Sequence, residues 1–564
     1  MRGIVHGLST GAIGTVDSDV PHMDRRRRPR GSPPSVYPSR MNSSRNHLLA
    51  GFLGLLVVTA ALPPAAAAAP WSGRTYPEKY DLRTHGRVTG VGKQDHHGTC
   101  WIFAAVGSLE SCLLPGARLD LSENHLADFQ GSRLRFEGRA PSTISTAYVA
   151  RWEGPVLERD DPYPHPGKSR EGLPAARHVQ EVLFLPSRGA PQANDAVKWA
   201  VMRYGAVDAT MAYEASGFNA ATSAYYSRGT DLDHHVCIVG WDDAYPAGRF
   251  LGRPPGPGAF LIKNSWGTTF GQGGYFWISY HDRSFGTTFT VFDGVEAAGN
   301  YDAIYQHDAL GWSRSIGFGN TTAWFAARYT SGGGGSVTAA SFYTAGPGAT
   351  YEVGVAPSLA EVAAAPVAGA GTIAVGGYHT VPLTTPVAVK TGADFVVAVR
   401  VTTPGTRAPI PVEAPTKLLA PRSAVARSFI SRDGVTWKDL RTRSGCGSAD
   451  VCLKAFVDSS GGRDDAPPRV RLEPATASPG TTARLRFTLT DPAFSCGSAV
   501  VKLWLQDARG RTLRQLRIPA AAVNERDTWR LVAPGRRGDY RILARAWDVV
   551  GHRSELTRAS LRVL

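Results

Sequence analysis

The chain has 564 residues, 43% of them hydrophobic and 19% charged, so it is too apolar for a disordered protein and too long for one compact domain. Its 62 Gly and 39 Pro exceed what a mainly helical protein uses and favour many short strands joined by turns. The formal charge of +15 comes mostly from Arg spread thinly along the chain. No Lys/Arg stripe interleaved with aromatic residues is present, which disfavours nucleic-acid binding but leaves contact with an anionic surface open.

The amino end looks like an extension followed by an export signal. Residues 1–40 are rich in Arg, Pro and Ser without apolar periodicity, so we expect a disordered or miscalled segment, with the true start at Met1 or Met41. Residues 41–69 combine a short cationic start, a fifteen-residue apolar run and an alanine tract, which is the layout of a secretory signal peptide.

A membrane anchor is the alternative for this segment. A spanning helix needs about 20 apolar residues, and Pro63 and Pro64 interrupt this run. No later segment is apolar enough to span a bilayer. We therefore expect a secreted, extracellular protein that can associate with the cell surface.

Residues 71–292 mix two periodicities. Helical patterns cover Cys100–Leu114 and Ala193–Tyr204, and short apolar runs typical of buried strands cover Val236–Trp241 and Ala259–Lys263. The sequence therefore predicts an α+β domain.

The remaining chain predicts two all-β domains. Residues 297–458 alternate apolar and polar residues, as in Thr350–Val355 and Asp394–Val401, between Gly, Pro and Asn turns. Residues 459–468 have the composition of a linker. Residues 469–564 again alternate and fit a small β-sandwich.

Six cysteines are too few for a disulfide-stabilised scaffold, although export would permit bridges. Cys446 and Cys452, with five residues between them in a Gly/Ser loop, are the one pair expected to form a disulfide. Cys112 and Cys237 are expected to be small buried hydrophobic residues, and Cys496 has no obvious partner.

One cysteine stands where a reactive thiol is expected. Cys100 follows a Gly-Thr turn at the start of an apolar helix. Unpaired amide groups and the positive end of the helix dipole stabilise a thiolate there, and a nearby imidazolium would lower the thiol pKa further. A buried structural cysteine is the alternative interpretation, but the position favours a nucleophile.

Two later segments supply partners for this nucleophile. His234 stands at the entrance of a buried strand in the segment Asp233-His-His-Val-Cys-Ile-Val-Gly-Trp, and Asn264 stands at the exit of another in Lys263-Asn-Ser-Trp-Gly. A nucleophile, a base and an orienting amide are thus present.

From Tyr76 to about His281 these segments resemble the papain family of cysteine peptidases. The resemblance rests on Gln94 six residues before Cys100-Trp, on His234 six residues before Gly-Trp, and on Lys-Asn-Ser-Trp-Gly. It implies that Cys100 is the nucleophile, that His234 is the general base and acid, and that Asn264 orients the imidazole. Gln94 would complete the oxyanion hole with the backbone N–H of Cys100.

The resemblance also implies weaker assignments. Trp266 would shield the His–Asn hydrogen bond from water, Gly138 would stand for the family's glycine-rich cleft wall, and His235, next to Asp233, would line the main specificity pocket. His97 replaces a cysteine that the family often bridges, and no metal or cofactor is expected. A prosegment of the usual length has no room before Tyr76.

Residues from about Tyr301 to Phe456 resemble the lectin-like domain that follows a papain-type peptidase in some secreted prokaryotic proteins. The motifs include Leu310-Gly-Trp, Ile430-Ser-Arg-Asp-Gly and Val451-Cys-Leu-Lys-Ala-Phe. The last domain resembles an immunoglobulin-like bacterial module. These resemblances are compatible with a cell-surface or glycan ligand for the two β domains, whereas the expectation of no nucleic acid rests on the charge pattern.

The sequence therefore predicts a secreted papain-like cysteine endopeptidase that acts on proteins or peptides through a thioester. Two alternatives remain: a hydrolase of cell-wall stem peptides, against which the Asn-Ser-Trp-Gly segment and Gln94 argue, and a catalytically silent papain fold used for adhesion.

Overall fold

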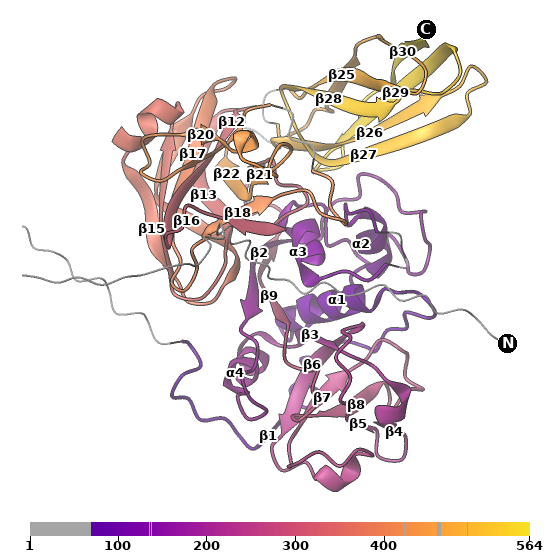
Figure 1. Ribbon diagram of the computed structural model, residues 1–564, viewed down its shortest axis with the longest axis vertical. Coiled ribbons are helices and arrows are strands. Elements are labelled where there is room, and N and C mark those ends of the chain that lie inside the picture. The colour runs from indigo at the N-terminus through magenta and orange to yellow at the C-terminus, as the bar shows by residue number, and fades with distance from the viewer. Residues whose placement is uncertain (1–68, 135, 137, 422–424, 460–463, 493–494) are drawn as a thin grey trace, which may run out of the picture. The chain divides into compact units, whose positions relative to one another are not determined.

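The computed structural model describes residues 69–564, apart from 135, 137, 422–424, 460–463 and 493–494 (Figure 1). The predicted extension, and the predicted signal peptide except Ala69, lie outside the described residues, as does the middle of the predicted linker. Within the described part, no helix has both the length and the apolar character needed to cross a bilayer.

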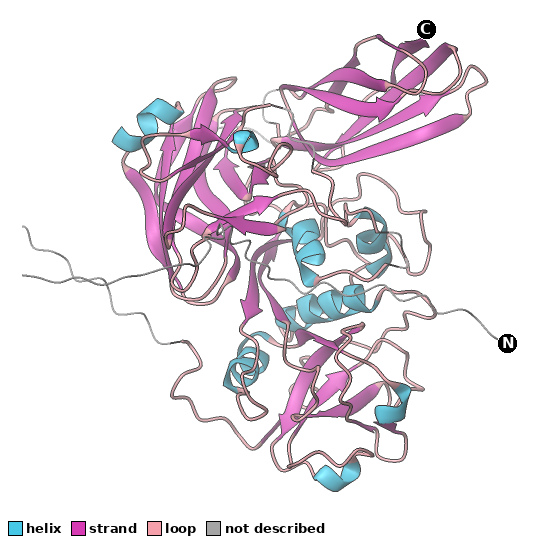
Figure 2. Ribbon diagram, in the orientation of Figure 1, coloured by secondary structure: helices cyan, strands magenta, loops and turns pink. Residues whose placement is uncertain are grey.

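The longer helices belong to the first domain (Figure 2). They are α1 (Cys100–Leu113), α2 (Glu123–Phe129), α3 (Ser142–Ala150) and α4 (Asp195–Tyr204). Helix α1 matches the predicted segment to within one residue, and α4 begins two residues later than expected. Ser122 starts α2 because its hydroxyl accepts a hydrogen bond from the backbone N–H of His125.

Helix α1 packs against β3 (Val207–Met211), β6 (His234–Asp242) and β9 (Phe289–Ala297). Antiparallel pairing continues from β6 to β7 (Ala259–Lys263) and from β7 to β8 (Tyr275–Ser279). Both strands expected in this domain are confirmed, and β6 extends two residues further toward His234. Short strands β1 (Lys79–Asp81), β4 (Phe218–Asn219) and β5 (Ala224–Tyr225) extend the sheet. The predicted α+β class is therefore confirmed.

The first sheet continues into the second domain. Strand β2 (Arg177–Leu185) pairs with β9 (Phe289–Ala297) on one side and with β16 (Gly377–Val389) on the other. Beyond β16 the sheet continues through β13 (Gly335–Thr344), β22 (Leu453–Asp458) and β10 (Ala303–Gln306). Backbone hydrogen bonds thus join two domains that composition alone separates.

A second sheet completes the middle domain. Its six strands are, in spatial order, β15 (Val367–Ile373), β14 (Ala349–Ala356), β17 (Asp394–Thr402), β12 (Thr322–Thr330), β19 (Ser428–Ser431) and β20 (Lys438–Asp439). Strands β14 and β17 contain the two alternating segments expected from the sequence. A three-stranded sheet of β11 (Arg314–Ile316), β18 (Ile410–Glu413) and β21 (Asp450–Val451) lies beside them.

The predicted disulfide between Cys446 and Cys452 is wrong, because both cysteines are free and buried. The Cys446 sulfur accepts a hydrogen bond from the Arg314 guanidinium at 3.0 Å and belongs to the core of the middle domain. Cys452 belongs instead to a cluster with the helices of the first domain. The two side chains therefore face different cores, and sequence spacing could not reveal this.

The C-terminal domain consists of two sheets around one apolar core. One sheet contains β23 (Arg469–Leu472), β25 (Thr482–Thr490) and β28 (Glu525–Val532). The other contains β24 (Ala475–Ala477), β30 (Thr557–Val563), β29 (Gly538–Asp548), β26 (Ser498–Gln506) and β27 (Thr512–Ala522). In β25 the four apolar residues that alternate with polar ones, Ala483, Leu485, Phe487 and Leu489, are buried.

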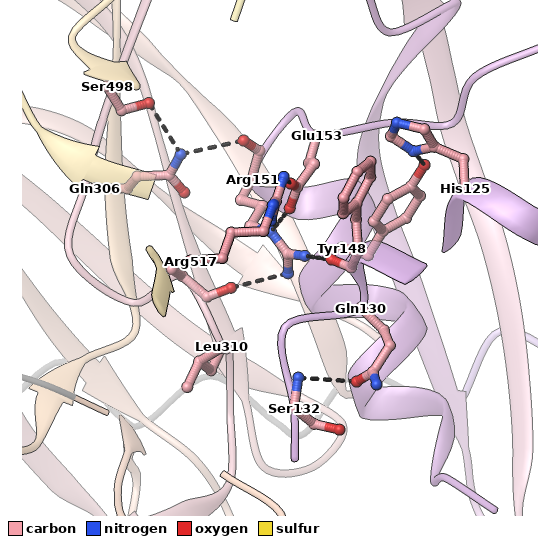
Figure 3. A network of polar contacts seen from close by, with 12 residues as sticks. His125, Gln130, Ser132, Tyr148, Arg151, Glu153, Gln306, Leu310, Ser498 and Arg517 are labelled. Atoms are coloured by element: carbon pink, nitrogen blue, oxygen red, sulfur yellow. Dashed lines mark hydrogen bonds and ion pairs between the residues drawn. The ribbon is translucent and has the colours of Figure 1, made fainter. Parts of the chain in front are cut away.

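A polar network links this domain to the first one (Figure 3). The Arg517 guanidinium on β27 binds the carboxylates of Glu153 and Glu171, which follow α3 in the chain, and lies 4.1 Å from the ring of Phe129. Arg151 donates to the carbonyls of Phe129 and Ala309 and so ties the same junction to the middle domain.

Candidate active site

Helix α1 places Cys100 at its first position. The thiol is buried, with the residue only 4% exposed, and its sulfur accepts hydrogen bonds from the backbone N–H groups of Trp101 and His235. The second of these contacts places the sulfur beside the start of β6. The Trp101 indole donates to the carbonyl of Gly138 at 2.9 Å and so holds the predicted cleft wall next to the helix start.

Strands β6 and β7 bring the other two predicted residues together. His234 is the first residue of β6, Asn264 directly follows β7, and the two strands are antiparallel neighbours. Nε2 of His234 donates to Oδ1 of Asn264 at 2.8 Å, and the same oxygen accepts the backbone N–H of Ser265. This hydrogen bond leaves Nδ1 of His234 as the ring nitrogen for proton transfer.

The ring of Trp266 covers this pair. It stacks on His234 with centroids 4.6 Å apart and an angle of 24° between the planes. Tyr213 meets the edge of the same indole at 4.6 Å. Water is thereby kept from the His234–Asn264 hydrogen bond, the shielding position that the resemblance implies for Trp266.

Burial disfavours the charged form of both Cys100 and His234. It raises the pKa of the Cys100 thiol to about 11, against the lowering by the two backbone N–H groups. It lowers the pKa of His234 to about 4, partly offset by Asn264. The lowered thiol pKa expected from the helix start alone is therefore wrong, because desolvation outweighs it. Burial therefore disfavours the charged form of each group.

Gln94 is buried behind the nucleophile and its orientation is set from two sides. Its Oε1 accepts from the Ser265 hydroxyl at 2.7 Å, and its Nε2 donates to the carbonyl of His97 at 2.6 Å. Its backbone N–H also donates to the carbonyl of Ser265. Sequence reasoning did not single out Ser265, although this residue stands inside the Asn-Ser-Trp segment.

The adjacent histidines point to different partners, as neighbours in a strand must. Nδ1 of His235 lies 2.9 Å from Oδ1 of Asp208 on β3, and the buried Asp208 also accepts from the Ser142 hydroxyl at the start of α3. Asp208 and Ser142 were not predicted, because they are distant in sequence and match no motif.

Asp233 lies at the edge of the region around His234 and His235. Its carboxylate accepts the backbone N–H of Tyr213 and lies 3.9 Å from the Arg139 guanidinium, which follows Gly138 in the chain. A weak ion pair thus joins the predicted subsite residue Asp233 to Arg139, the chain neighbour of Gly138.

A cavity of about 500 Å³ lies near the site, but Cys100 is not among the residues that line it. It borders Asn264 and Ser265 from behind and is lined by carboxylates that include Glu110 and by the Lys263 ammonium, which donates to Thr89. The catalytic geometry, rather than the cavity, therefore identifies the site.

Comparisons with known proteins agree with this geometry. The family model described as "Papain family cysteine protease" matches residues 76–291, and the one described as "Lectin like domain" matches residues 304–457. Cathepsin K of Mus musculus is 29% identical over 212 residues, or 36% of this chain and 60% of its own length. Cathepsin L of Sarcophaga peregrina is 28% identical over 231 residues, or 39% and 62%. The chain thus spans about six-tenths of these curated relatives.

A solved structure covers both matched domains. The crystal structure of the cysteine protease and lectin-like domains of Cwp84, a surface layer associated protein of Clostridium difficile, is 25% identical with a TM-score of 0.61. The alignment covers 69% of this chain and 90% of that one. A second Cwp84 structure, determined after propeptide cleavage, gives the same identity and TM-score over 68% of this chain.

Proposed function

Because this chain belongs to the papain family of cysteine proteases through its residues 76–291, we propose that it is a secreted endopeptidase that hydrolyses peptide bonds through a thioester on Cys100. One observation carries the proposal. The hydrogen bond from His234 to Asn264 lies under the Trp266 ring and beside the start of α1, where Cys100 stands.

The reaction would proceed by acyl transfer. The Cys100 sulfur attacks the substrate carbonyl carbon, and its proton goes to Nδ1 of His234. The imidazolium then returns that proton to the leaving amine as the C–N bond breaks and the thioester forms. Water, deprotonated by the same nitrogen, hydrolyses the thioester and restores the thiol.

Two groups would stabilise the oxyanion in each half of the reaction. They are the backbone N–H of Cys100, at the amino end of α1, and the side-chain amide of Gln94. The hydroxyl of Ser265 orients this amide because it donates to Oε1. One hydrogen of Nε2 binds the His97 carbonyl, and the other would donate to substrate. Asn264 would hold the imidazole in the productive tautomer.

We further propose that the enzyme acts outside the cell, where its two β domains position it on a surface or glycan. Residues 41–69 have the layout of an export signal, and the middle domain matches the lectin-like family. Cwp84 is a surface layer associated protein, which makes an envelope protein a reasonable class of substrate to test.

The test is hydrolysis of casein and of a synthetic peptidoglycan stem peptide by the mature protein. We expect casein cleavage that Cys100→Ala abolishes and that Cys112→Ala, a cysteine in the same helix, leaves unchanged. Cleavage of the stem peptide alone would support the cell-wall hydrolase instead. Casein cleavage by Cys100→Ala would end the proposal, and inactivity of the wild-type protein on both substrates would favour an adhesion role.

A further inference from the structure

The C-terminal domain carries most of the net positive charge of the chain. Residues 469–564 contain 18 Lys and Arg but only eight Asp and Glu, so two-thirds of the formal charge of +15 lies in this last stretch. The predicted amino-terminal segments, residues 1–69, hold the rest, with eight Arg against three Asp. Positive and negative residues therefore nearly balance in the first two domains. The excess of positive charge in the third domain needs an explanation.

The structure gathers arginines that look scattered in the sequence. In the sheet of β23, β25 and β28, residues that belong to the core alternate with residues that face outward. Strands β25 and β28 lie side by side in this sheet (Figure 1). Six exposed arginines occupy the outward positions: Arg469, Arg471, Arg484, Arg486, Arg526 and Arg530. We call this outward face the arginine face.

The register within the sheet brings like charges together. Arg484 lies directly opposite Arg530 in the β25–β28 pair, an arrangement that destabilises a sheet. Thr488 lies between Arg471 and Arg526 and adds a hydroxyl group. Among the described residues, one ion pair is recorded on this face, from Arg526 to Glu473 at 2.6 Å.

A shallow hollow adjoins the face between β24 and β25. It has a volume of about 280 Å³ and is lined by Arg484, Arg486, Thr476 and Thr482, and also by Glu473, whose carboxylate binds Arg526. Two guanidinium groups and two hydroxyls around one hollow form a set of donors that suits a tetrahedral anion.

The opposite sheet of the same domain already contacts the first domain. Its Arg517 and Lys502 bind Glu171 of the first domain, and the apolar core separates the two sheets. The arginine face belongs to the other sheet, so the junction with the first domain does not use it.

We propose that the arginine face docks an extended polymer that carries a phosphate group on each repeat, as an anchor on the cell envelope. A row of arginines at alternate positions of adjacent strands presents cations at regular spacing, which matches repeating anions. The outward residues of these strands are otherwise mainly threonines, with no aromatic ring on which bases could stack. Val532 is the one large apolar side chain exposed there, too little for insertion into a bilayer.

Binding of the mature protein to inorganic polyphosphate tests the proposal. We expect measurable affinity that falls steeply between about 50 and 300 mM salt, because neutralised phosphates release counterions. The variant Arg484→Gln/Arg486→Gln/Arg530→Gln should bind at least tenfold more weakly. Its matched control is Arg514→Gln/Arg541→Gln/Arg558→Gln, which removes three exposed charges from the other sheet and should change affinity less than twofold.

Three results would overturn the proposal. The first is an equal loss of polyphosphate affinity in the two triple variants, and the second is tighter binding to oligo-dT than to polyphosphate. The third is binding to phosphatidylglycerol vesicles that persists in the first triple variant. The single change Arg530→Gln guards against misfolding, since it relieves the like-charge pair and should still weaken binding about threefold. Peptide hydrolysis should stay unchanged in all these variants, so a failure of the docking proposal is distinguishable from a failure of the catalytic one.

Discussion

At the scale of single residues, the proposed catalytic pair is Cys100 and His234, two buried groups whose opposite charges are expected to stabilise each other. Burial raises the pKa of Cys100 to about 11 and lowers that of His234 to about 4, so each charge needs the other. The reactivity of the thiol is therefore expected to depend on the imidazole more than on the helix dipole.

The variant His234→Ala tests this dependence. Without an imidazolium, the thiol keeps the high pKa that burial imposes, so alkylation of Cys100 by iodoacetamide at pH 6 should fall at least tenfold. Asn264→Ala should retain part of the labelling and of the turnover, since orientation aids the base without replacing it. Cys112 and Cys237 are internal controls, because burial raises the pKa of each thiol to about 12. Unchanged labelling of Cys100 in His234→Ala would contradict the pair.

Replacement of Gln94 should weaken the stabilisation of the oxyanion without changing the reactivity of the Cys100 sulfur. Gln94→Ala is expected to lower kcat by ~10²–10³ while Cys100 alkylation stays unchanged. Ser265→Ala should show a weaker form of the same pattern, about tenfold in kcat, because it removes only the group that orients the amide. A large drop in alkylation rate in either variant would argue against these roles.

His235 should control substrate choice rather than chemistry. Its ring is held by Asp208, and its loss should leave the enzyme active while widening acceptance of Leu or Phe two residues before the scissile bond. Profiling His235→Ala on a fluorogenic peptide library measures this. The double variant His235→Ala/Asp208→Asn controls for the buried carboxylate left without its partner. An inactive His235→Ala beside an active His234→Ala would mean that His235, and not His234, is the base.

At the scale of elements, the join between β2 and β16 depends on one glycine. Gly377 has φ +151°, and a Cβ there would collide with the carbonyl oxygen of Val182 on β2. No side chain fits without moving one strand from the other. The first two domains therefore share a sheet only while this position has no side chain.

The variant Gly377→Ala should loosen that join. We expect a destabilisation of about 1–3 kcal/mol, seen as a lower midpoint of thermal unfolding and faster limited proteolysis between the domains. Gly354→Ala in β14 is the matched control, because nothing lies within 4 Å of the point where its Cβ would stand. Equal midpoints for the two variants would show that β16 does not depend on the glycine.

At the scale of the whole molecule, a charged cluster joins the third domain to the first. The Arg517 guanidinium binds two carboxylates, those of Glu153 and Glu171, whose side chains are 5% and 8% exposed. Removal of the cation leaves Glu153 with Arg151 and Glu171 with Lys502, so each buried acid loses one of its two cationic partners. Such a loss is more costly than the pair was favourable.

Arg517→Ala is therefore expected to destabilise the junction by about 3–5 kcal/mol. Differential scanning calorimetry should resolve a separate, earlier transition for the C-terminal domain, whereas the exposed Arg514→Ala on the same strand should leave the profile unchanged. Peptide hydrolysis should persist in both variants. A single unshifted transition in Arg517→Ala would show that other contacts hold the domain.

The sequence by itself determined the local features: the start of α1 at Cys100, the buried strand close after His234 and the one that ends before Asn264, and the alternation that buries Leu485 and its neighbours in β25. These follow from periodicity and short motifs, which depend on residues close together in the chain. The position of Gln94 beside the site could also be expected, because its segment leads directly into the helix.

Only the tertiary structure decided which distant residues meet. It paired Asp208 with His235 and Ser265 with Gln94, separated Cys446 from Cys452, joined β2 to β16, and gathered the arginines of three strands on one face. Burial, which opposes the helix dipole at Cys100, is likewise set by the surrounding packing. These partners are chosen by packing between segments far apart in sequence, where no local pattern specifies which surfaces come into contact.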